Sequence, residues 1–399
     1  MNQSSPSPAM RWASVDALRA LTMLLMIFVN DLWSLRDIPG WLEHTQAQED
    51  GMGLADTVFP AFLFIVGMSI PLAVRHRIGK GDSMSALLWH IAGRSLALLV
   101  MGLFLVNGEN INPDATGMSR GAWNSICCTC FILIWNSWPA SVPGWLKLSL
   151  RLMSVAVLGW LAWRFRSGDA PSLRGFETHW WGILGLIGWA YLVSAIIYVL
   201  VRRQPWALLG AWLFFLINCI LGHSGGLSGL TWWETLLSPL GGGAMPALVL
   251  GGVLLTTILL YYTEKKEQGK LIAIILIIAV LLIVAGFGLR PAWGISKIRA
   301  TPAWVLICSG ITTGVFALVY WITDRKQINW WAFMRPAGTQ TLLCYLMPYY
   351  AYALIPVLGI GLPAILLTGT IGLIKSLAFS LLMIAIAGLL ARVGVRVKL

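Results

Sequence analysis

The chain has 399 residues, of which 58% are hydrophobic and 11% charged, and its mean hydropathy is +0.78. Soluble domains carry about 25% charged residues, so this composition excludes a soluble enzyme and indicates an integral membrane protein. The net charge of +12 is typical of the cation bias of cytoplasmic loops. Since the sequence has no continuous basic tract or nucleic-acid-binding motif, we expect no nucleic-acid partner.

The N-terminal residues 1–10 are rich in Pro and Ser and predict a disordered cytoplasmic tail. The first apolar segment runs from Val15 to Leu35 and contains Asp16 and Arg19. It is too long for the core of a signal peptide, so we expect it to remain as a spanning helix. Asp16 and Arg19 lie three residues apart, which predicts a structural ion pair on one helical face.

Further apolar segments along the chain predict an all-α, polytopic membrane protein in which residues 11–399 form a single domain. Two Trp-rich stretches, 122–145 and 228–245, also fit re-entrant or interfacial segments, so the expected number of spans is ten to twelve. The segments that follow the first lie near 54–74, 89–107, 122–138, 146–165, 180–201, 205–222, 245–262, 271–289, 303–323, 337–357 and 372–391.

The distribution of cations predicts the orientation of the chain. With a cytoplasmic N-terminus, 19 of the 28 Lys and Arg residues fall inside, eight fall outside, and Lys375 lies within the last span. This asymmetry predicts that both termini are cytoplasmic. The six cysteines all lie in or beside apolar segments; we interpret them as packing residues and expect no metal site. The 22 tryptophans favour an interfacial belt, with a sugar-stacking surface as the alternative.

The predicted outer loop after the first span reverses the overall charge. Between Asp31 and Asp56 it has six acidic residues and one cation, Arg36, for a formal charge of −5. Such a loop attracts cationic solutes. It also contains His44, and an imidazole exchanges its proton near neutral pH, as general acid/base catalysis requires.

Each of these residues also has a structural interpretation. Asn30, at the outer end of the first span, is equally suited to a hydrogen bond between helices. A lone loop histidine is most often solvated. Asp56 stands beside the start of the second span, where an acidic side chain can cap a helix.

Several ordered motifs resemble the heparan-α-glucosaminide N-acetyltransferase family. They are Ser14-Val15-Asp16-Ala17-Leu18-Arg19-Ala20, then Phe28-Val29-Asn30, then His44, and then Gly53-Leu54-Ala55-Asp56-Thr57-Val58-Phe59-Pro60-Ala61-Phe62-Leu63-Phe64-Ile65-Val66-Gly67-Met68-Ser69-Ile70. Similarity extends to Lys297 and Thr301-Pro302. The segment between Asn30 and His44 lacks the glycine-rich tract of the animal enzymes, so the acceptor is open.

The resemblance implies a bacterial relative: a multi-pass acyltransferase of the inner membrane that moves the acetyl group of cytosolic acetyl-CoA to the amine of a glucosamine-type sugar on the periplasmic side. It places catalysis on His44, as base or transient acyl carrier, with Asn30 as its companion. Asp31, Glu49, Asp50 and Asp56 are the expected acceptor-binding residues. Lys297 either contacts substrate or binds a lipid headgroup, and a homodimer is left open.

Two other functions fit the same residues. One is an amino-sugar transporter in which the acidic loop is a cation vestibule and His44 couples protons. The other is an O-acyltransferase that modifies a hydroxyl of an envelope glycan. Retention of activity when glucosamine is replaced by N-acetylglucosamine would favour the O-acyltransferase, since that acceptor lacks a free amine.

Overall fold

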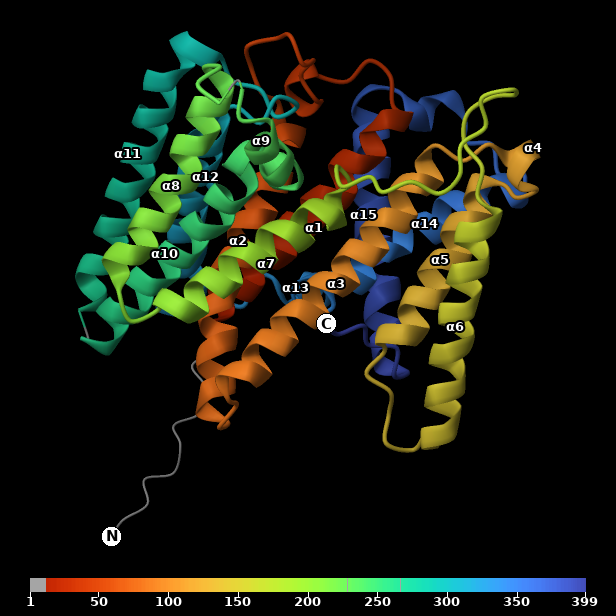
Figure 1. Ribbon diagram of the computed structural model, residues 1–399, viewed down its shortest axis with the longest axis horizontal. Helices are drawn as coiled ribbons and strands as arrows, with labels where there is room; N and C mark the ends of the chain where they lie inside the picture. The colour runs from red at the N-terminus through yellow and green to blue at the C-terminus, as the bar shows by residue number, and fades with distance from the viewer. Residues whose placement is uncertain (1–11, 228, 266) are drawn as a thin grey trace. The chain divides into compact units, whose positions relative to one another are not determined.

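The computed structural model describes residues 12–227, 229–265 and 267–399, and its named elements are all helices (Figure 1). The predicted tail, residues 1–10, lies outside the described residues. The chain forms two compact units: Met1–Thr22, Gly40–Ser95 and Ile187–Ala332 make the first, and Met23–Pro39, Leu96–Leu186 and Phe333–Leu399 make the second. The helices α1 (Ala13–Asp31), α3 (Met84–Glu109) and α7 (Ile183–Val201) contribute to both.

In the described residues, ten helical segments are long and apolar enough to cross a membrane, which confirms the predicted all-α, polytopic class. Two of the predicted spans are shorter than expected: α5 (Arg120–Trp135) has 16 residues and α14 (Thr341–Val357) has 17. At 1.5 Å per residue they measure about 24–26 Å, less than the roughly 30 Å of a bilayer core.

The first unit is organised around α2 (Leu54–Gly79), which packs against α10 (Ala244–Glu264). Gly67 and Gly252 allow the close approach, because a Cβ atom on either would overlap a backbone carbonyl oxygen of the facing helix. Small residues serve this purpose in membrane helices, where lipid supplies no hydrophobic force to pull helices together. The α10 helix also packs on α8 (Pro205–His223).

The α12 helix (Pro302–Tyr320) lies beside α11 (Gln268–Trp293) (Figure 1) and also contacts α2. The short α9 (Thr231–Leu237) precedes α10. Near the start of α1, Asp16 and Arg19 form the predicted ion pair, with 2.9 Å between the carboxylate oxygen and the guanidinium nitrogen. Arg19 also donates to Ser69 of α2 at 2.6 Å, which fixes the start of α1 against this unit.

The second unit contains α4 (Pro113–Thr116), α5, α6 (Gly144–Arg164), α13 (Arg335–Thr339), α14 and α15 (Gly369–Arg392). The α5 helix packs against α6 and α14, and α14 packs against α15.

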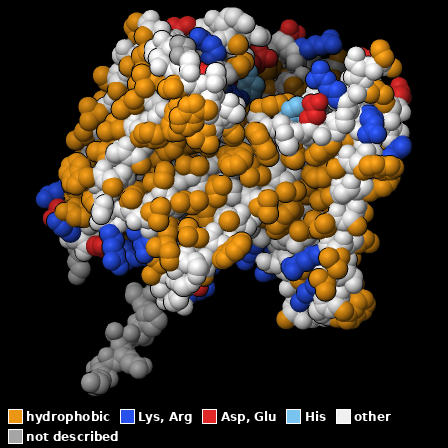
Figure 2. Space-filling model, in the orientation of Figure 1, with side chains coloured by type: hydrophobic (Ala, Val, Ile, Leu, Met, Phe, Trp, Pro, Cys, Tyr) orange, Lys and Arg blue, Asp and Glu red, His pale blue; other side chains and the backbone are white. Residues whose placement is uncertain are grey.

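All six cysteines are free and buried, which confirms their interpretation as packing residues. Hydrophobic side chains cover the flank of the first unit formed by α8 and α11 (Figure 2), as expected of a surface that faces lipid.

Candidate functional site

The candidate site of the first unit lies where the loop 43–53 meets the N-terminus of α2. Gly53 caps this helix, and its Cβ atom, if present, would overlap the carbonyl oxygen of Glu43. Asp56 is the third residue of the helix, and its carboxylate accepts a hydrogen bond from the N–H of Gly53 at 3.1 Å. An acidic residue at this position is stabilised by the helix N-terminus, so the capping role considered for Asp56 is present.

The same carboxylate holds His44. Asp56 is fully buried, and its Oδ1 lies 2.7 Å from Nδ1 of His44, whose side chain is 47% exposed. The other oxygen, Oδ2, accepts hydrogen bonds from the backbone N–H of Thr45 at 3.0 Å and from its hydroxyl at 2.6 Å. Because a carboxylate only accepts, Nδ1 carries the proton, and the lone pair of the neutral ring is on Nε2.

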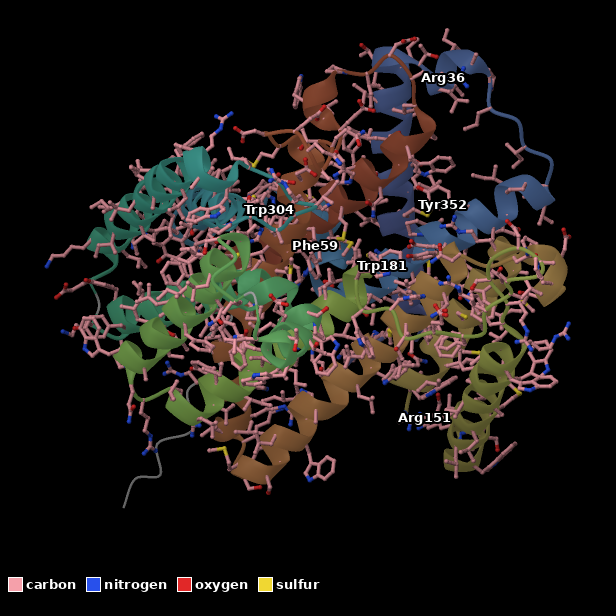
Figure 3. The ribbon with its side chains drawn as sticks, turned by 45° about the horizontal axis from the view of Figure 1, so that its top comes forward. Arg36, Phe59, Arg151, Trp181, Trp304 and Tyr352 are labelled. Atoms are coloured by element: carbon pink, nitrogen blue, oxygen red, sulfur yellow. The ribbon has the colours of Figure 1, made fainter. Side chains whose placement is uncertain are left out.

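A second segment of the first unit closes around this pair from the side of α12. The indole N–H of Trp304, which is fully buried, donates to the backbone oxygen of Asp56 at 3.0 Å; Figure 3 labels Trp304. Lys297, in the loop before α12, has its Nζ 3.3 Å from Nδ1 of His44. Burial lowers the pKa of Lys297, and the charge of Asp56 opposes that shift. Since the Nδ1 proton points at Asp56, the ammonium acts on the pair through its charge.

Asp50 fixes the loop to the same segment. Its carboxylate pairs with Arg290 at 2.9 Å and accepts the N–H of Ile295 at 2.7 Å. These two bonds hold the pKa of Asp50 below its ordinary value. The N–H of Gly51 donates to the oxygen of Ile295 at 3.0 Å. Asp50 is therefore placed to brace the loop, whereas Glu49 is exposed and accepts only the N–H of Gln46 at 3.1 Å in the described residues.

Two sequence-predicted residues lie in the second unit. Asn30, the penultimate residue of α1, is exposed. Asp31 is buried and pairs with Lys375 of α15 at 2.7 Å, while Ser376 and Tyr352 donate to its carboxylate at 2.6 and 3.0 Å. Asp31 is therefore the partner of Lys375, the one cation that the sequence places within the last span.

Three of the six acidic residues of the predicted loop therefore have a basic partner within their own unit. Asp31 faces Lys375, Asp50 faces Arg290, and Asp56 faces His44 and lies near Lys297. Of the four acceptor-binding acids expected from the sequence, Glu49 alone is exposed without a cationic partner in the described residues.

Sequence reasoning missed Thr45, Arg290 and Trp304. The one available signal was for Thr45, which directly follows His44. A carboxylate that contacts His44 can also accept hydrogen bonds from the next residue of the same loop, as Asp56 does. Nothing in the sequence pairs Arg290 with Asp50 or Trp304 with Asp56, since these contacts join segments about 240 residues apart.

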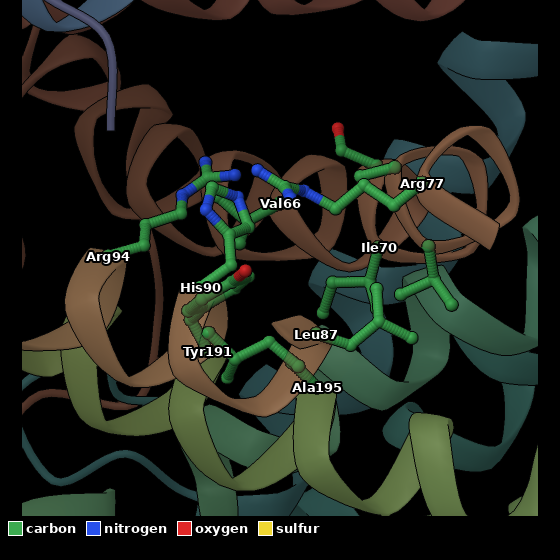
Figure 4. A pocket seen from close by; sticks show the side chains of 12 residues that line it. Val66, Ile70, Arg77, Leu87, His90, Arg94, Tyr191 and Ala195 are labelled. Atoms are coloured by element: carbon green, nitrogen blue, oxygen red, sulfur yellow. The ribbon is translucent and has the colours of Figure 1, made fainter. Parts of the chain in front are cut away.

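A second polar feature of the first unit is a narrow pocket of about 20 Å³ among α2, α3 and α7. Arg77, His90 and Arg94 bring their nitrogen atoms together at one side of it, opposite apolar side chains that include Ile70 and Leu87 (Figure 4). The guanidinium of Arg94 lies 4.7 Å from the ring centroid of Tyr191. The volume is on the order of that needed for one water.

The described residues contain no group of three or more His, Cys, Asp or Glu side chains placed to hold a metal ion. Fold and site together define a polytopic α-helical membrane protein with a buried aspartate that orients a solvent-accessible histidine at the start of a membrane-length helix.

Comparisons with known proteins identify the family of this chain and two named relatives. Residues 11–238 match the family described as a domain of unknown function, DUF5009, and the chain belongs to this family. It is also 38% identical over 101 residues to the human protein heparan-alpha-glucosaminide N-acetyltransferase, and 36% identical over 105 residues to that of the mouse. These matches cover 24% and 25% of this chain, and 14% and 15% of the two relatives.

Proposed function

We propose that this protein is a membrane acetyltransferase that moves the acetyl group of acetyl-CoA to the amine of a glucosamine-type sugar, with Nε2 of His44 as the reacting group. The observation that carries the proposal is the 2.7 Å contact between a fully buried Asp56 and a half-exposed His44. Support for this reaction class comes from the similarity to two proteins named as N-acetyltransferases.

The arrangement fits general base catalysis. Asp56 holds the proton on Nδ1 and stabilises the imidazolium that forms when Nε2 accepts a proton, the role that a buried aspartate has in a catalytic triad. In the direct route, Nε2 takes a proton from the acceptor ammonium, and the freed amine attacks the thioester carbonyl carbon. The C–S bond breaks, the CoA sulfur leaves as a thiolate, and the imidazolium returns a proton to it. The second proton lost by the attacking nitrogen passes to solvent water, so the products are the amide, CoA thiol and one released proton.

In the two-step route, Nε2 itself attacks the carbonyl carbon and forms an acyl-imidazole as the thiolate leaves. The acceptor ammonium then loses one proton to solvent water, the freed amine attacks this acyl group, and the C–N bond to Nε2 breaks. The second proton of the attacking nitrogen passes to the freed Nε2 and from there to the CoA thiolate. Lys297 is a cation beside the pair in both routes, and we propose that it offsets the charge of Asp56 while His44 is neutral. Its pKa is lowered by burial.

We propose that Glu49, an exposed acid of the loop 43–53, binds the ammonium group of the acceptor. The resemblance gives Asn30 a companion role in catalysis, and we propose that it contributes to acetyl transfer through its exposed side-chain amide. Asp31, Asp50 and Asp56 are engaged in the contacts described above, so we assign them positioning roles instead.

For the donor, we propose that Arg94 holds the phosphates of acetyl-CoA at the basic side of the α2–α3–α7 pocket, with Arg77, which also pairs with Asp82 at 2.7 Å, as a second cation. Val66, which lines this pocket, lies about 15 Å along α2 from Asp56, a distance suited to an extended pantetheine arm. Since Arg75 does not line this pocket and pairs with Glu264, Arg75→Gln is a matched control. Arg94→Gln should raise the KM for acetyl-CoA about tenfold, and Arg75→Gln should not.

The cation distribution along the sequence supports a periplasmic position for the loop 43–53 in a bacterial inner membrane, with acetyl-CoA entering from the cytoplasm. Sealed proteoliposomes test this orientation when donor and acceptor are supplied on opposite sides, because product should then form in only one of the two arrangements.

The experiment that tests the function measures transfer of labelled acetyl from acetyl-CoA to glucosamine by purified protein in proteoliposomes. We expect transfer by the wild type and loss of transfer in His44→Ala. His179→Ala is the matched control, because His179 pairs with Glu177 in the second unit and should retain wild-type turnover.

Three results would overturn the proposal. Equal turnover of His44→Ala and the wild type would remove His44 from the chemistry. Uptake of labelled glucosamine without acetyl-CoA, and without acetylated product, would instead identify a transporter. Acetylation of N-acetylglucosamine at the glucosamine rate would identify an O-acyltransferase.

A further inference from the structure

The second unit contains a basic hollow at one end of α6, made of residues that the proposed function does not use. This helix has Trp145 near its start and Trp163 near its end, each 70% exposed. The two are separated by about 27 Å along the helix, close to the roughly 30 Å of a bilayer core. Tryptophans of spanning helices lie at the membrane interfaces, so the first turns of α6 lie at the level of the lipid headgroups.

Three cations line the hollow at this level. Lys147 and Arg151 lie one turn apart on α6, and Lys398 comes from the C-terminal segment. The hollow has a volume of about 620 Å³, and its lining contains no acidic residue. Figure 3 labels Arg151, and Figure 2 shows Lys and Arg side chains gathered at this end of α5 and α6.

The cations are brought together by the backbone. The N–H of Ser137 donates to the oxygen of Arg396 at 2.8 Å, and the N–H of Arg396 donates to the side chain of Asn136 at 2.7 Å. The N–H of Lys398 then donates to the oxygen of Trp135 at 3.2 Å. This pairing ties the C-terminal segment to the end of α5, so Lys398 faces α6.

The positive charge of the hollow is uncompensated in the part of the chain that the structure describes, because none of the three cations forms an ion pair there. The indole Nε1 of Trp138, which also lines the hollow, is shielded from solvent and has no hydrogen-bond partner among the described residues. Both observations point to an anionic ligand.

The adjoining surface of α6 is apolar. Leu148, Leu152 and Val155 are 56–60% exposed, and their spacing of four and three residues places them on one helical face. This stripe begins beside the hollow and continues toward the middle of the predicted bilayer. A ligand that occupies both must have an anionic head and long apolar chains.

We propose that the hollow binds the phosphodiester headgroup of an anionic glycerophospholipid, whose acyl chains lie along the Leu148–Val155 stripe. A free phosphate shares the charge but cannot use the stripe. This proposal is independent of the acetyltransferase assignment, because none of its residues contributes to the His44 site.

The test uses the purified full-length protein and native mass spectrometry, with phosphatidylglycerol, phosphatidylcholine of the same chain length, and inorganic phosphate as separate probes. The variant is Lys147→Gln/Arg151→Gln. The control, Arg335→Gln/Arg392→Gln, removes two exposed cations of the same unit outside the hollow. Lipid-free thermal unfolding of both variants checks that they are folded.

We expect the wild type and the control variant to bind phosphatidylglycerol more tightly than phosphatidylcholine, and inorganic phosphate not to displace the lipid. The Lys147→Gln/Arg151→Gln variant should bind phosphatidylglycerol about 25-fold more weakly, since each cation near an anionic headgroup is worth about fivefold. Equal weakening in both variants would overturn the proposal, as would equal affinity for the two lipids. Displacement of the lipid by inorganic phosphate would assign the hollow to a free anion.

Discussion

Replacement of Asp56 by Asn should inactivate His44 without removing it. Oδ2 of Asp56 accepts three hydrogen bonds, from Thr45 N–H, the Thr45 hydroxyl and Gly53 N–H, while Oδ1 accepts one from His44. In Asp56→Asn, the amide oxygen is best placed where the three donors converge, so the NH2 group faces Nδ1 of His44. An amide donates to a lone pair, so the imidazole proton would move to Nε2.

The magnitude follows from the bond that is lost. A hydrogen bond to a charged group contributes about 1.5–3 kcal/mol, which corresponds to roughly a 10- to 150-fold loss of kcat. Conversion of Nε2 from a lone pair to an N–H would add to that loss. Because the amide keeps the shape of the carboxylate and the bonds to the backbone, we expect the fold to be retained.

The assay compares kcat for acetyl transfer with the unfolding temperature of the same preparation. Glu49→Gln is the matched control, an acid-to-amide change in the same loop at a side chain that does not contact His44. It should affect KM for the acceptor more than kcat. A folded Asp56→Asn protein with the kcat of the wild type would refute the reasoning about the Nε2 lone pair.

Four further predictions concern stability and pH. Gly53→Ala should destabilise the protein by about 1–3 kcal/mol, because a Cβ atom there overlaps the backbone oxygen of Glu43. The control Gly51→Ala should be close to neutral, because the nearest atom to its Cβ would be 3.6 Å away. Equal unfolding temperatures of the two variants would contradict this prediction. Asp31→Asn should cost about 3–5 kcal/mol by leaving Lys375 unpaired, and the double variant Asp31→Asn/Lys375→Met should recover most of the loss in chemical denaturation; an additive loss would exclude coupling of the pair. The lowered pKa of Asp50 gives a stabilising contribution that is present above its ordinary value of 3.8 and is lost as the pH falls through the lower folded value. Because the pKa of Lys297 is lowered in the folded protein, the unfolded state binds more protons between that folded value and 10.5, so stability should rise with pH in this range. Measurements of unfolding across pH test both groups. Lys297→Met should lack the rise in stability at alkaline pH, and Asp50→Asn should lack the loss of stability at acid pH.

The sequence predicted the helical class well because apolar runs of bilayer length have few alternative structures. The two shorter helices, α5 and α14, were harder to predict, since hydropathy does not show where a helix ends. Trp135 is followed by Asn136 in an extended conformation, where the chain pairs with the C-terminal segment instead of continuing the helix.

At the candidate site, the sequence indicated His44 and its acidic surroundings. It did not indicate which acids pair with cations and which acid contacts the histidine. The residues that compensate Asp31 and Asp50 come from α15 and α11, about 344 and 240 residues away. No local pattern encodes such pairings. The contact between Asp56 and His44 spans only 12 residues, yet it depends on a loop conformation that requires glycine at position 53.

The central claim is that His44 and Asp56 act as one unit, and a double-mutant cycle on kcat/KM for acetyl transfer tests it most directly. We predict that His44→Ala lowers kcat/KM more than Asp56→Asn does, and that the double variant is no less active than His44→Ala alone, because Asp56 acts only through the imidazole. Independent, multiplicative losses in the double variant would contradict the account.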